Sequence, residues 1–346
     1  MRAIVRAKYG SPDVLHLEEF ERPIPKANEA LVKVLASSLN AADLEDLRGN
    51  PFVRIGAARK PRHSILGSDI AGRVEAVGMN VREFRPGDEL WGDLSATSGY
   101  GTFVEYVCVP EKALRLKPAG MTFEQAAAIP TAAVVAMQNL RAARPSAPGF
   151  FLSGEGQIQP GQKVLINGAG GGVGTFAIQI AKSFGAKVTG VDSARKLDML
   201  QSIGADHVID YAREDFTKSG QRYDLILDIV CNRSILSCRR ALSHRGTYVI
   251  VGGSTPAILQ ALLLGPLITN IGRKKMGLAP WRPNRKEDLD SLKALFEAGK
   301  VVPVIDRRYP LSEVPEALRY LAGGRQLGKI VITMENGGEA YRGARS

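Results

Sequence analysis

The segment 163–192 constrains the fold of this chain more than any other part of the sequence. It begins with a short apolar run rich in β-branched residues, 163–167, and the glycine-rich run GAGGGVG follows at once. Glycine lets a chain reverse sharply from strand to helix while its backbone N–H groups approach a pyrophosphate. Ala169 stands where the dinucleotide-binding pattern has its first glycine, and Gly171 and Gly174 hold the next two glycine positions.

A helix and a second strand complete this unit. Apolar spacing over 175–184 predicts a packed helix. Its dipole and first N–H groups, around Gly172 and Val173, would form an anion site without a basic side chain. The strand 187–191 leads to Asp192, about 20 residues after the turn, where an acid that binds the ribose is expected. An ordinary glycine-rich turn is the alternative, but the complete series favours a nicotinamide dinucleotide site.

Length and charge limit the class of protein. The 346 residues suffice for two domains, and the net charge of +11 fits a nucleic acid, an anionic membrane or a dinucleotide as partner. The basic residues show neither the aromatic spacing of an RNA-stacking surface nor the pattern of a DNA-reading helix, so we expect no specific nucleic-acid binding. No segment approaches the ~20 apolar residues of a membrane span, and the nearest candidate, 258–271, is interpreted as a buried or interface segment.

Cysteine usage and the start of the chain indicate the compartment. Cys108, Cys231 and Cys238 are too few and too unevenly spaced for a disulfide framework or a structural zinc lobe. The chain starts directly with a strand and has no signal-peptide core. These features predict a cytoplasmic protein.

The composition and the spacing of apolar residues change twice along the chain. Residues 1–125 form short alternating runs separated by Gly, Pro and Asp, which is typical of a β-rich domain. In 126–284 strands alternate with helices, which favours a doubly wound parallel sheet, an α/β fold. Residues 285–346 begin with an amphipathic helix and return to strands, so we expect them to rejoin the first domain. The Pro/Gly/Ser-rich stretch 144–156 is a surface insertion, a lid or a subunit contact. Further elements are expected at 30–35, 71–78, 102–107, 126–140, 197–203, 223–228, 246–253, 286–298, 301–305 and 329–333.

Together these motifs resemble the medium-chain dehydrogenase/reductase superfamily, and within it the zinc-independent quinone oxidoreductase-like group. The matching segments, besides the glycine turn, are 40–43, 48–49, 67–72, 77–78, 86–88, 101–106, 160–161, 204–205, 251–253 and 328–329. The resemblance implies a GroES-like β-rich domain and a Rossmann domain inserted between its two segments. It also implies a cofactor cleft at the junction of the domains and, commonly, a homodimer.

The same resemblance bears on metal binding. Zinc-dependent alcohol dehydrogenases use a Cys and a His-Glu pair, whereas Asn40, Ser68 and Asp69 stand at these positions here. We therefore expect no zinc, and we interpret His63 as a surface histidine. Without a Lewis acid, alcohol–aldehyde interconversion loses its main charge stabilisation. A quinone or an α,β-unsaturated carbonyl instead moves the charge to a distant oxygen, which hydrogen-bond donors and water can stabilise.

Candidate catalytic residues follow from these matches. Asn40 is the first candidate for a donor near the nicotinamide and substrate, and Asp43 is the second, with helix capping as its alternative role. Many relatives carry a Tyr where this chain has Glu45, and a Thr-Ala pair where it has 135–136. Cys231 replaces a glycine usual in the family. It is either simply packed or, if it lines the cleft, able to react with an electrophilic enone.

The resemblance also extends the cofactor site. Lys329 is a candidate pyrophosphate contact, or is merely solvent-facing. Asp192 favours NADH, because its carboxylate can bind both ribose hydroxyls and would repel a 2′-phosphate. Ser193, Tyr211 and the cations Arg195 and Lys196 favour NADPH. The alternative for the two cations is a solvated first helical turn. We expect NADPH as cofactor, with NADH also accepted. The candidate cofactor residues are Ala169, Gly171, Gly172, Val173, Gly174, Asp192, Ser193, Arg195, Lys196, Tyr211, Cys231, Val251, Gly252, Gly253 and Lys329.

The sequence thus predicts a zinc-free NAD(P)H-dependent oxidoreductase that transfers hydride to a quinone or an α,β-unsaturated carbonyl. A zinc-free alcohol or ketone reductase is the alternative within enzymes. The basic charge and the missing Tyr leave open a non-catalytic dinucleotide-sensing or RNA-binding protein on the same fold.

Overall fold

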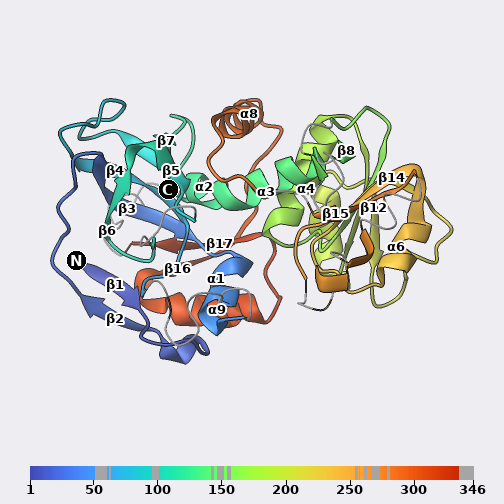
Figure 1. The fold of residues 1–346 in the computed structure, drawn as a ribbon, viewed down its shortest axis with the longest axis horizontal. Coiled ribbons are helices and arrows are strands. Elements are labelled where there is room, and N and C mark those ends of the chain that lie inside the picture. The colour runs from blue at the N-terminus through green and yellow to red at the C-terminus, as the bar shows by residue number, and fades with distance from the viewer. Residues whose placement is uncertain are drawn as a thin grey trace, which may run out of the picture. The chain divides into compact units, whose positions relative to one another are not determined.

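The computed structural model describes residues 1–50, 61, 64–95, 101–141, 144–145, 152–153, 157–253, 256, 258–260, 263–265, 273–278 and 281–334. The chain forms two compact units (Figure 1). The first unit comprises Met1–Thr131 and Ile305–Ser346, and the second comprises Ala132–Val304. No helix in these ranges is both long enough and apolar enough to cross a membrane.

The first unit is organised around a seven-stranded sheet. Its strands run in the order β16-β17-β3-β4-β5-β7, and β6 pairs with β3 outside this path. All its pairs are antiparallel except β16 with β17. The strands are β3 (Glu29–Ser38), β4 (Asp69–Val77), β5 (Glu89–Asp93), β6 (Tyr106–Pro110), β7 (Leu114–Leu116), β16 (Ile305–Pro310) and β17 (Lys329–Thr333).

Shorter elements complete the first unit. A hairpin of β1 (Arg2–Val5) and β2 (His16–Glu19) lies beside the main sheet, and Ala3 of β1 forms an isolated bridge to Val104. The helices are α1 (Ala41–Arg48), α2 (Phe123–Ala128) and α9 (Val314–Ala322). Buried side chains from both sequence segments form one apolar core, so residues after 304 complete the unit begun by the N-terminus.

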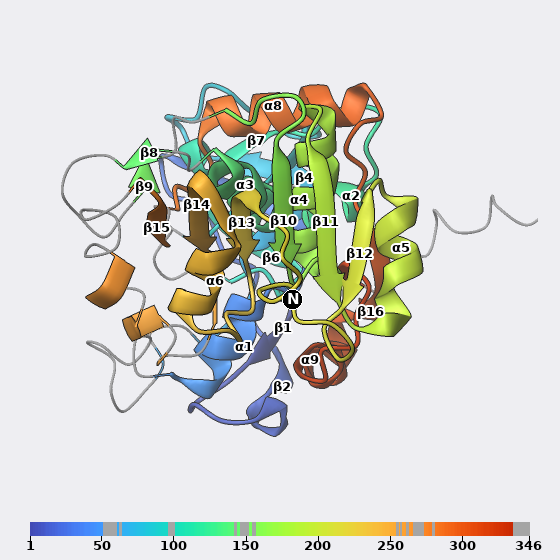
Figure 2. The ribbon, with the colours of Figure 1, turned by 90° about the vertical axis from the view of Figure 1, so that its right-hand side faces the viewer.

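The second unit contains six parallel strands in the order β12-β11-β10-β13-β14-β15 (Figure 2). This is the doubly wound order, in which the chain starts in the middle of the sheet and reverses direction once. The strands are β10 (Lys163–Asn167), β11 (Lys187–Asp192), β12 (His207–Asp210), β13 (Tyr223–Asp228), β14 (Leu242–Ile250) and β15 (Lys275–Leu278). Its helices include α3 (Pro130–Leu140), α4 (Gly172–Ser183), α5 (Leu197–Ser202), α6 (Ile235–Ala241) and α8 (Lys286–Glu297).

Several boundaries differ from those expected. Residues 126–140 form two helices, α2 and α3, because Pro130 lacks the N–H that a continuous helix requires. The strand expected at 301–305 begins only at Ile305. Before it, the Gln179 side chain bonds both the N–H and the C=O of Val302, at 2.8 and 3.0 Å, and thus takes the place of a neighbouring strand. The strand expected at 102–107 begins at Tyr106.

Two further expectations concern the ends of the second unit. The helix α8 belongs to this unit, whereas the sequence assigns it to the returning segment. Apart from a short pairing of β8 (Arg144–Pro145) with β9 (Leu152–Ser153), the stretch 144–156 lies outside the described residues. Most of 258–271 and His63 lie outside them as well.

Candidate functional site

The glycine turn lies at the carboxyl end of β10, and each glycine in it has a different role. A Cβ atom on Gly174 would lie 2.4 Å from the Gly168 carbonyl oxygen and 2.5 Å from that of Ala169. Glycine is therefore required there for α4 to pack against the turn. A Cβ on Gly171, the N-cap residue of α4, would have Gly168 O as its nearest neighbour, at 3.7 Å. Gly171 thus faces open space.

The start of α4 provides donors toward this space. Gly171, Gly172 and Val173 are partly exposed, and the first N–H groups of a helix have no acceptor within it. The helix dipole adds partial positive charge at the same end. A phosphate approaching Gly171 would meet backbone donors and no obstructing side chain, so the residues present fit a dinucleotide pyrophosphate.

The other candidate cofactor residues follow neighbouring strands at the same edge of the sheet. Asp192 ends β11, Tyr211 follows β12, Cys231 lies just after β13, and 251–253 follow β14. Because the carboxyl ends of parallel strands share one edge, the sheet brings these residues together with the glycine turn. A surface hollow of about 780 Å³ instead lies near Ser183, at the opposite end of α4 from the turn, and we assign it no role in cofactor binding.

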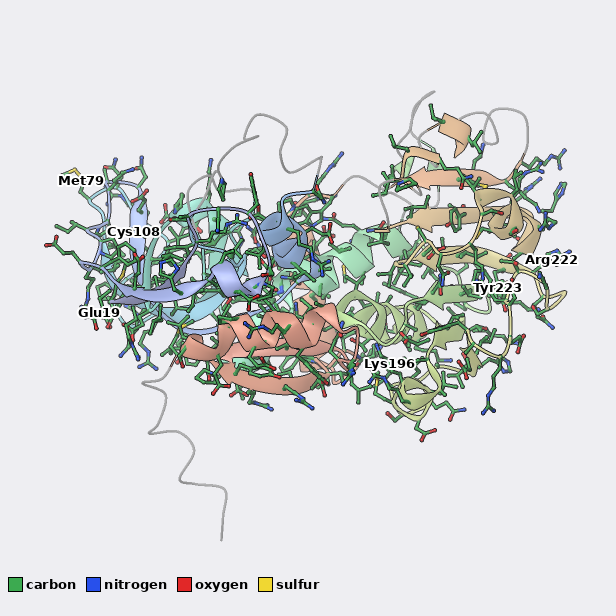
Figure 3. The ribbon with its side chains drawn as sticks, turned by 90° about the horizontal axis from the view of Figure 1, so that it is seen from below. Glu19, Met79, Cys108, Lys196, Arg222 and Tyr223 are labelled. Carbon is green, nitrogen blue, oxygen red and sulfur yellow. The ribbon has the colours of Figure 1, made fainter. Side chains whose placement is uncertain are left out.

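Asp192 is directed inward rather than toward solvent. One carboxylate oxygen accepts a hydrogen bond from Gly170 N at 2.8 Å, and the other accepts one from Ser193 N at 2.8 Å. The ammonium of Lys196 lies 3.5 Å from the carboxylate, and both side chains are buried. Figure 3 shows Lys196 at one edge of the second unit. The charge of Asp192 is therefore balanced within the protein, while Tyr211 is 47% exposed.

Cys231 occupies a constrained position. Its φ of 52° lies in the left-handed region, which explains why glycine is usual there. Its backbone N–H donates to Asp228, and its sulfur lies 3.9 Å from the Tyr248 hydroxyl. Burial, followed by the neighbouring Asp228 carboxylate, raises the pKa of the Cys231 thiol. The thiol is packed and protonated, so the structure does not support the reactive role considered for it.

Asn40 and Asp43 begin α1 in the first unit. The backbone N–H of Asn40 donates to the Asp43 carboxylate at 2.7 Å, which matches the capping role considered for this acid. Asp43 is buried, and desolvation raises its pKa from 3.8 to about 7, although the bond from Asn40 and the charge of Lys329 oppose the shift. Asp43 is thus a buried acid with a pKa near neutral, bonded to the backbone of Asn40.

Lys329 is buried in the same cluster. Its ammonium donates to Leu39 O at 3.0 Å, to Asn40 Oδ1 at 2.7 Å and to Asp69 Oδ2 at 3.3 Å. An ammonium has three hydrogens, and these acceptors use all of them. Lys329 is only 2% exposed and retains no free donor, so this geometry does not support the expected pyrophosphate contact.

Further polar residues, which sequence reasoning did not select, complete the cluster. Asp69 also accepts from Ser38 Oγ at 2.7 Å and from the backbone N–H of Thr131 at 2.8 Å. The Thr131 hydroxyl donates to Asp93 at 2.8 Å and lies 3.3 Å from Ser68 Oγ. Burial and the nearby Asp69 raise the pKa of Asp93. A polar residue directly after an apolar run, as Asp93 is at the end of β5, is the sequence signal that could have identified it.

The cluster does not contain the donor set of a zinc site. At the positions of the zinc ligands it holds an amide, a hydroxyl and a carboxylate, from Asn40, Ser68 and Asp69, and the Lys329 ammonium is already bonded to two of these residues. Within the described ranges, no group of three or more His, Cys, Asp or Glu side chains is arranged to hold a metal ion.

Profiles of known protein families together match nearly the whole chain. A profile described as alcohol dehydrogenase GroES-like domain matches residues 26–119. One described as alanine dehydrogenase/PNT, C-terminal domain, matches 132–231, and one described as zinc-binding dehydrogenase matches 203–332. The first match covers most of the N-terminal segment of the β-rich unit, and the other two cover the parallel sheet and the returning segment.

Individual proteins extend the comparison. The 2-methylene-furan-3-one reductase of Solanum lycopersicum is 34% identical, with 96% of this chain and 79% of that protein covered. The chloroplastic NADPH-dependent alkenal/one oxidoreductase of Arabidopsis thaliana is 32% identical, with the same coverage.

Solved structures agree in fold. The quinone oxidoreductase of Coxiella burnetii superposes with a TM-score of 0.83 at 29% identity, over 96% of this chain and 99% of that one. The Escherichia coli quinone oxidoreductase complexed with NADPH superposes with a TM-score of 0.80 at 25% identity, over 96% and 100% of the two chains. With its GroES-like unit, its Rossmann-type sheet and these relatives, the chain belongs to the quinone oxidoreductase/alkenal reductase group of the medium-chain dehydrogenase/reductase superfamily.

Proposed function

We propose that this protein is a zinc-independent, NADPH-dependent reductase of quinones or α,β-unsaturated carbonyls. The observation that carries the proposal is the polar cluster of Asn40, Ser68, Asp69 and Lys329, which offers hydrogen bonds but no metal-ligand set. A carbonyl conjugated to an alkene or ring spreads the incoming charge onto oxygen, where hydrogen bonds suffice to stabilise it. An unconjugated ketone gains less from such a cluster, because its alkoxide calls for a stronger electrophile.

The second unit supplies the residues that would hold the cofactor. Gly171 leaves room for the pyrophosphate, and the N–H groups at the start of α4 donate to it. When bound, the reduced nicotinamide supplies a hydride. The protein's own part is to bind and orient the reactants, which can contribute much of the rate enhancement.

The arrangement around Asp192 supports NADPH as the preferred cofactor. Its carboxylate is already bonded to Gly170 and Ser193 and is paired with Lys196, so its repulsion of a 2′-phosphate is reduced. Arg195 is exposed on the same short segment and can add a charge-assisted contact to phosphate. We expect NADH to be accepted as well.

A steady-state assay tests the proposal. NADPH oxidation would be followed with a quinone, an enone and an unconjugated ketone, on protein whose metal content has been measured. We expect turnover with the quinone or the enone, little with the ketone, and no effect of a chelator. Activity that is lost to a chelator and restored by zinc would overturn the proposal that the enzyme works without a metal. Tight NADPH binding without any turnover would favour a dinucleotide-sensing protein instead.

A further inference from the structure

We propose that the hydroxyl of Ser68, rather than the amide of Asn40, donates the hydrogen bond to the substrate oxygen on which charge accumulates. This inference rests on the proposed function, because it assigns the donor for the same reduction. It follows from counting which donors of the polar cluster are already used inside the first unit.

The Asn40 amide is held in one orientation and is used internally. Its oxygen accepts from the Lys329 ammonium at 2.7 Å, and its Nδ2 donates to Asp69 at 2.9 Å and lies 3.4 Å from Ser68 Oγ. Flipping the amide would place its NH2 against an ammonium and its oxygen against a carboxylate. Both hydrogens of Nδ2 therefore point into the cluster, one to Asp69 over a short bond and the other to Ser68 Oγ over a longer one.

Ser68 differs because its hydrogen has no strong acceptor in the cluster. Its Oγ lies 3.3 Å from the Thr131 hydroxyl, which is long for an O–H···O bond, and Thr131 uses its own hydrogen on Asp93 at 2.8 Å. Thr131 can therefore only accept from Ser68. A substrate oxyanion at about 2.7 Å would form a shorter, charge-assisted bond and would displace this weak partner.

The backbone of Ser68 is held in place, although the direction of its hydroxyl hydrogen is not. The residue directly precedes β4, and its carbonyl accepts from the Leu94 N–H at 2.8 Å. The preceding Gly67 adopts a φ of 96°, and a Cβ there would lie 2.3 Å from Thr102 Oγ1, so the turn permits little variation. The side chain is partly exposed. A donor that is held rigidly and does not need to reorganise suits oxyanion stabilisation.

Lys329 and Asp69 act behind Ser68 as positioning residues. The ammonium polarises the Asn40 amide, whose N–H is aimed at both Asp69 and the Ser68 oxygen. Hydrogen bonds in such a chain strengthen one another, so the Ser68 O–H becomes a better donor. The ligand class this site would take is a small conjugated carbonyl compound that becomes an enolate or a phenolate on reduction.

Paired substitutions test the donor assignment. Ser68→Ala removes the hydroxyl, Ser68→Thr retains it, and Ser64→Ala is a matched control on an exposed serine of the same loop. Loss of one oxyanion donor typically costs about 10²–10³ in kcat, so we expect a fall of roughly 100-fold for Ser68→Ala. Ser68→Thr should keep most of the activity, and the affinity for NADPH should be unchanged in all three variants. Equal kcat in wild type and Ser68→Ala would overturn the assignment.

A binding measurement separates this inference from the proposed reduction. The probe is 4-nitrophenolate, titrated by absorbance in the presence of NADP⁺ at a pH at which it is ionised. We expect wild type and Ser68→Thr to bind it at least tenfold more tightly than Ser68→Ala. That result without turnover of any carbonyl compound would support the oxyanion site and refute the proposed reduction. Equal phenolate affinity in wild type and Ser68→Ala would refute the Ser68 assignment, whether or not the enzyme turns over.

Discussion

Burial and neighbouring charge determine the chemistry of single side chains in the first unit. Asp69 and Lys329 are both buried, but each has a charged partner and further hydrogen bonds. This buried ion pair fixes the orientation of the Asn40 amide, because the amide oxygen accepts from Lys329 and the amide nitrogen donates to Asp69. Asp43 differs, because desolvation dominates and its pKa rises to about 7.

The raised pKa of Asp43 predicts a loss of stability with rising pH. The folded state keeps the proton up to about pH 7, whereas the unfolded chain releases it near 3.8. Folding therefore binds a proton in this window, and the free energy of unfolding falls by up to about 1.4 kcal/mol per pH unit as pH rises from 5 toward 7. Urea unfolding at several pH values would measure it. Asp43→Asn should flatten this dependence, and equal slopes in the two proteins would contradict the assignment.

The cysteines provide a second prediction at the residue scale. Cys108, Cys231 and Cys238 are buried, and burial is the largest cause of the raised pKa in each, to about 11 for Cys108 and about 12 for Cys238. Since the thiolate is the nucleophile, all three should react slowly with a thiol reagent in the native protein and rapidly in denaturant. Rapid native labelling of Cys231 that NADPH prevents would restore its role as a reactive group at the cofactor site.

At the scale of elements, two glycines in the turn between β10 and α4 have different expected roles, Gly174 in folding and Gly171 in cofactor binding. Gly174→Val places side-chain atoms against the carbonyls of Gly168 and Ala169, so it should destabilise the protein. Gly171→Val meets no atom closer than 3.7 Å at its Cβ and should fold normally, but it fills the space for the pyrophosphate. We expect cofactor affinity to fall at least tenfold, about 1.4 kcal/mol. Fluorescence titration and thermal unfolding would check the pair, and near-native affinity in folded Gly171→Val would refute the phosphate site.

The segment that joins β11 to α5 predicts the cofactor preference. Lys196→Ala leaves the Asp192 carboxylate without its cation, and Arg195→Ala removes an exposed cation, so both should lower the ratio of kcat/KM for NADPH to that for NADH. Asp192→Ser should raise this ratio. The contradicting outcome has three parts. The wild type strongly prefers NADH, Asp192→Ser abolishes this preference, and Arg195→Ala leaves the ratio unchanged. This outcome would identify the carboxylate as the controlling group.

The same elements show what could be predicted from the sequence. The strands β10, β13 and β17 match the expected bounds, because each is a short apolar run between clear turn signals. The roles of Asn40 and Lys329 could not be predicted in this way. Their partners lie far away in the sequence, and only the antiparallel pairing of β3 with β4 and β17 brings them together. Residue type identified Asn40 as polar, but did not show that its amide is hydrogen-bonded inside the cluster.

On the scale of the whole molecule, the chain leaves the first unit at Thr131 and returns at Ile305. The polar cluster thus needs the N-terminal segment, the start of α3 and the C-terminal strand β17 to fold together. The second unit contributes the glycine turn at the carboxyl edge of its parallel sheet. We propose that the first unit stabilises the charge that develops on the substrate and that the second unit binds the cofactor.

The most direct test of this account is the position to which hydride is delivered. Metal-free protein would be incubated with NADPH deuterated at C4 of the nicotinamide and with an α,β-unsaturated ketone, and the product would be analysed by NMR. We predict deuterium on the β-carbon of a saturated ketone, because the cluster stabilises an enolate oxygen. Deuterium on the carbonyl carbon of an allylic alcohol would contradict the account and identify the protein as an alcohol or ketone reductase.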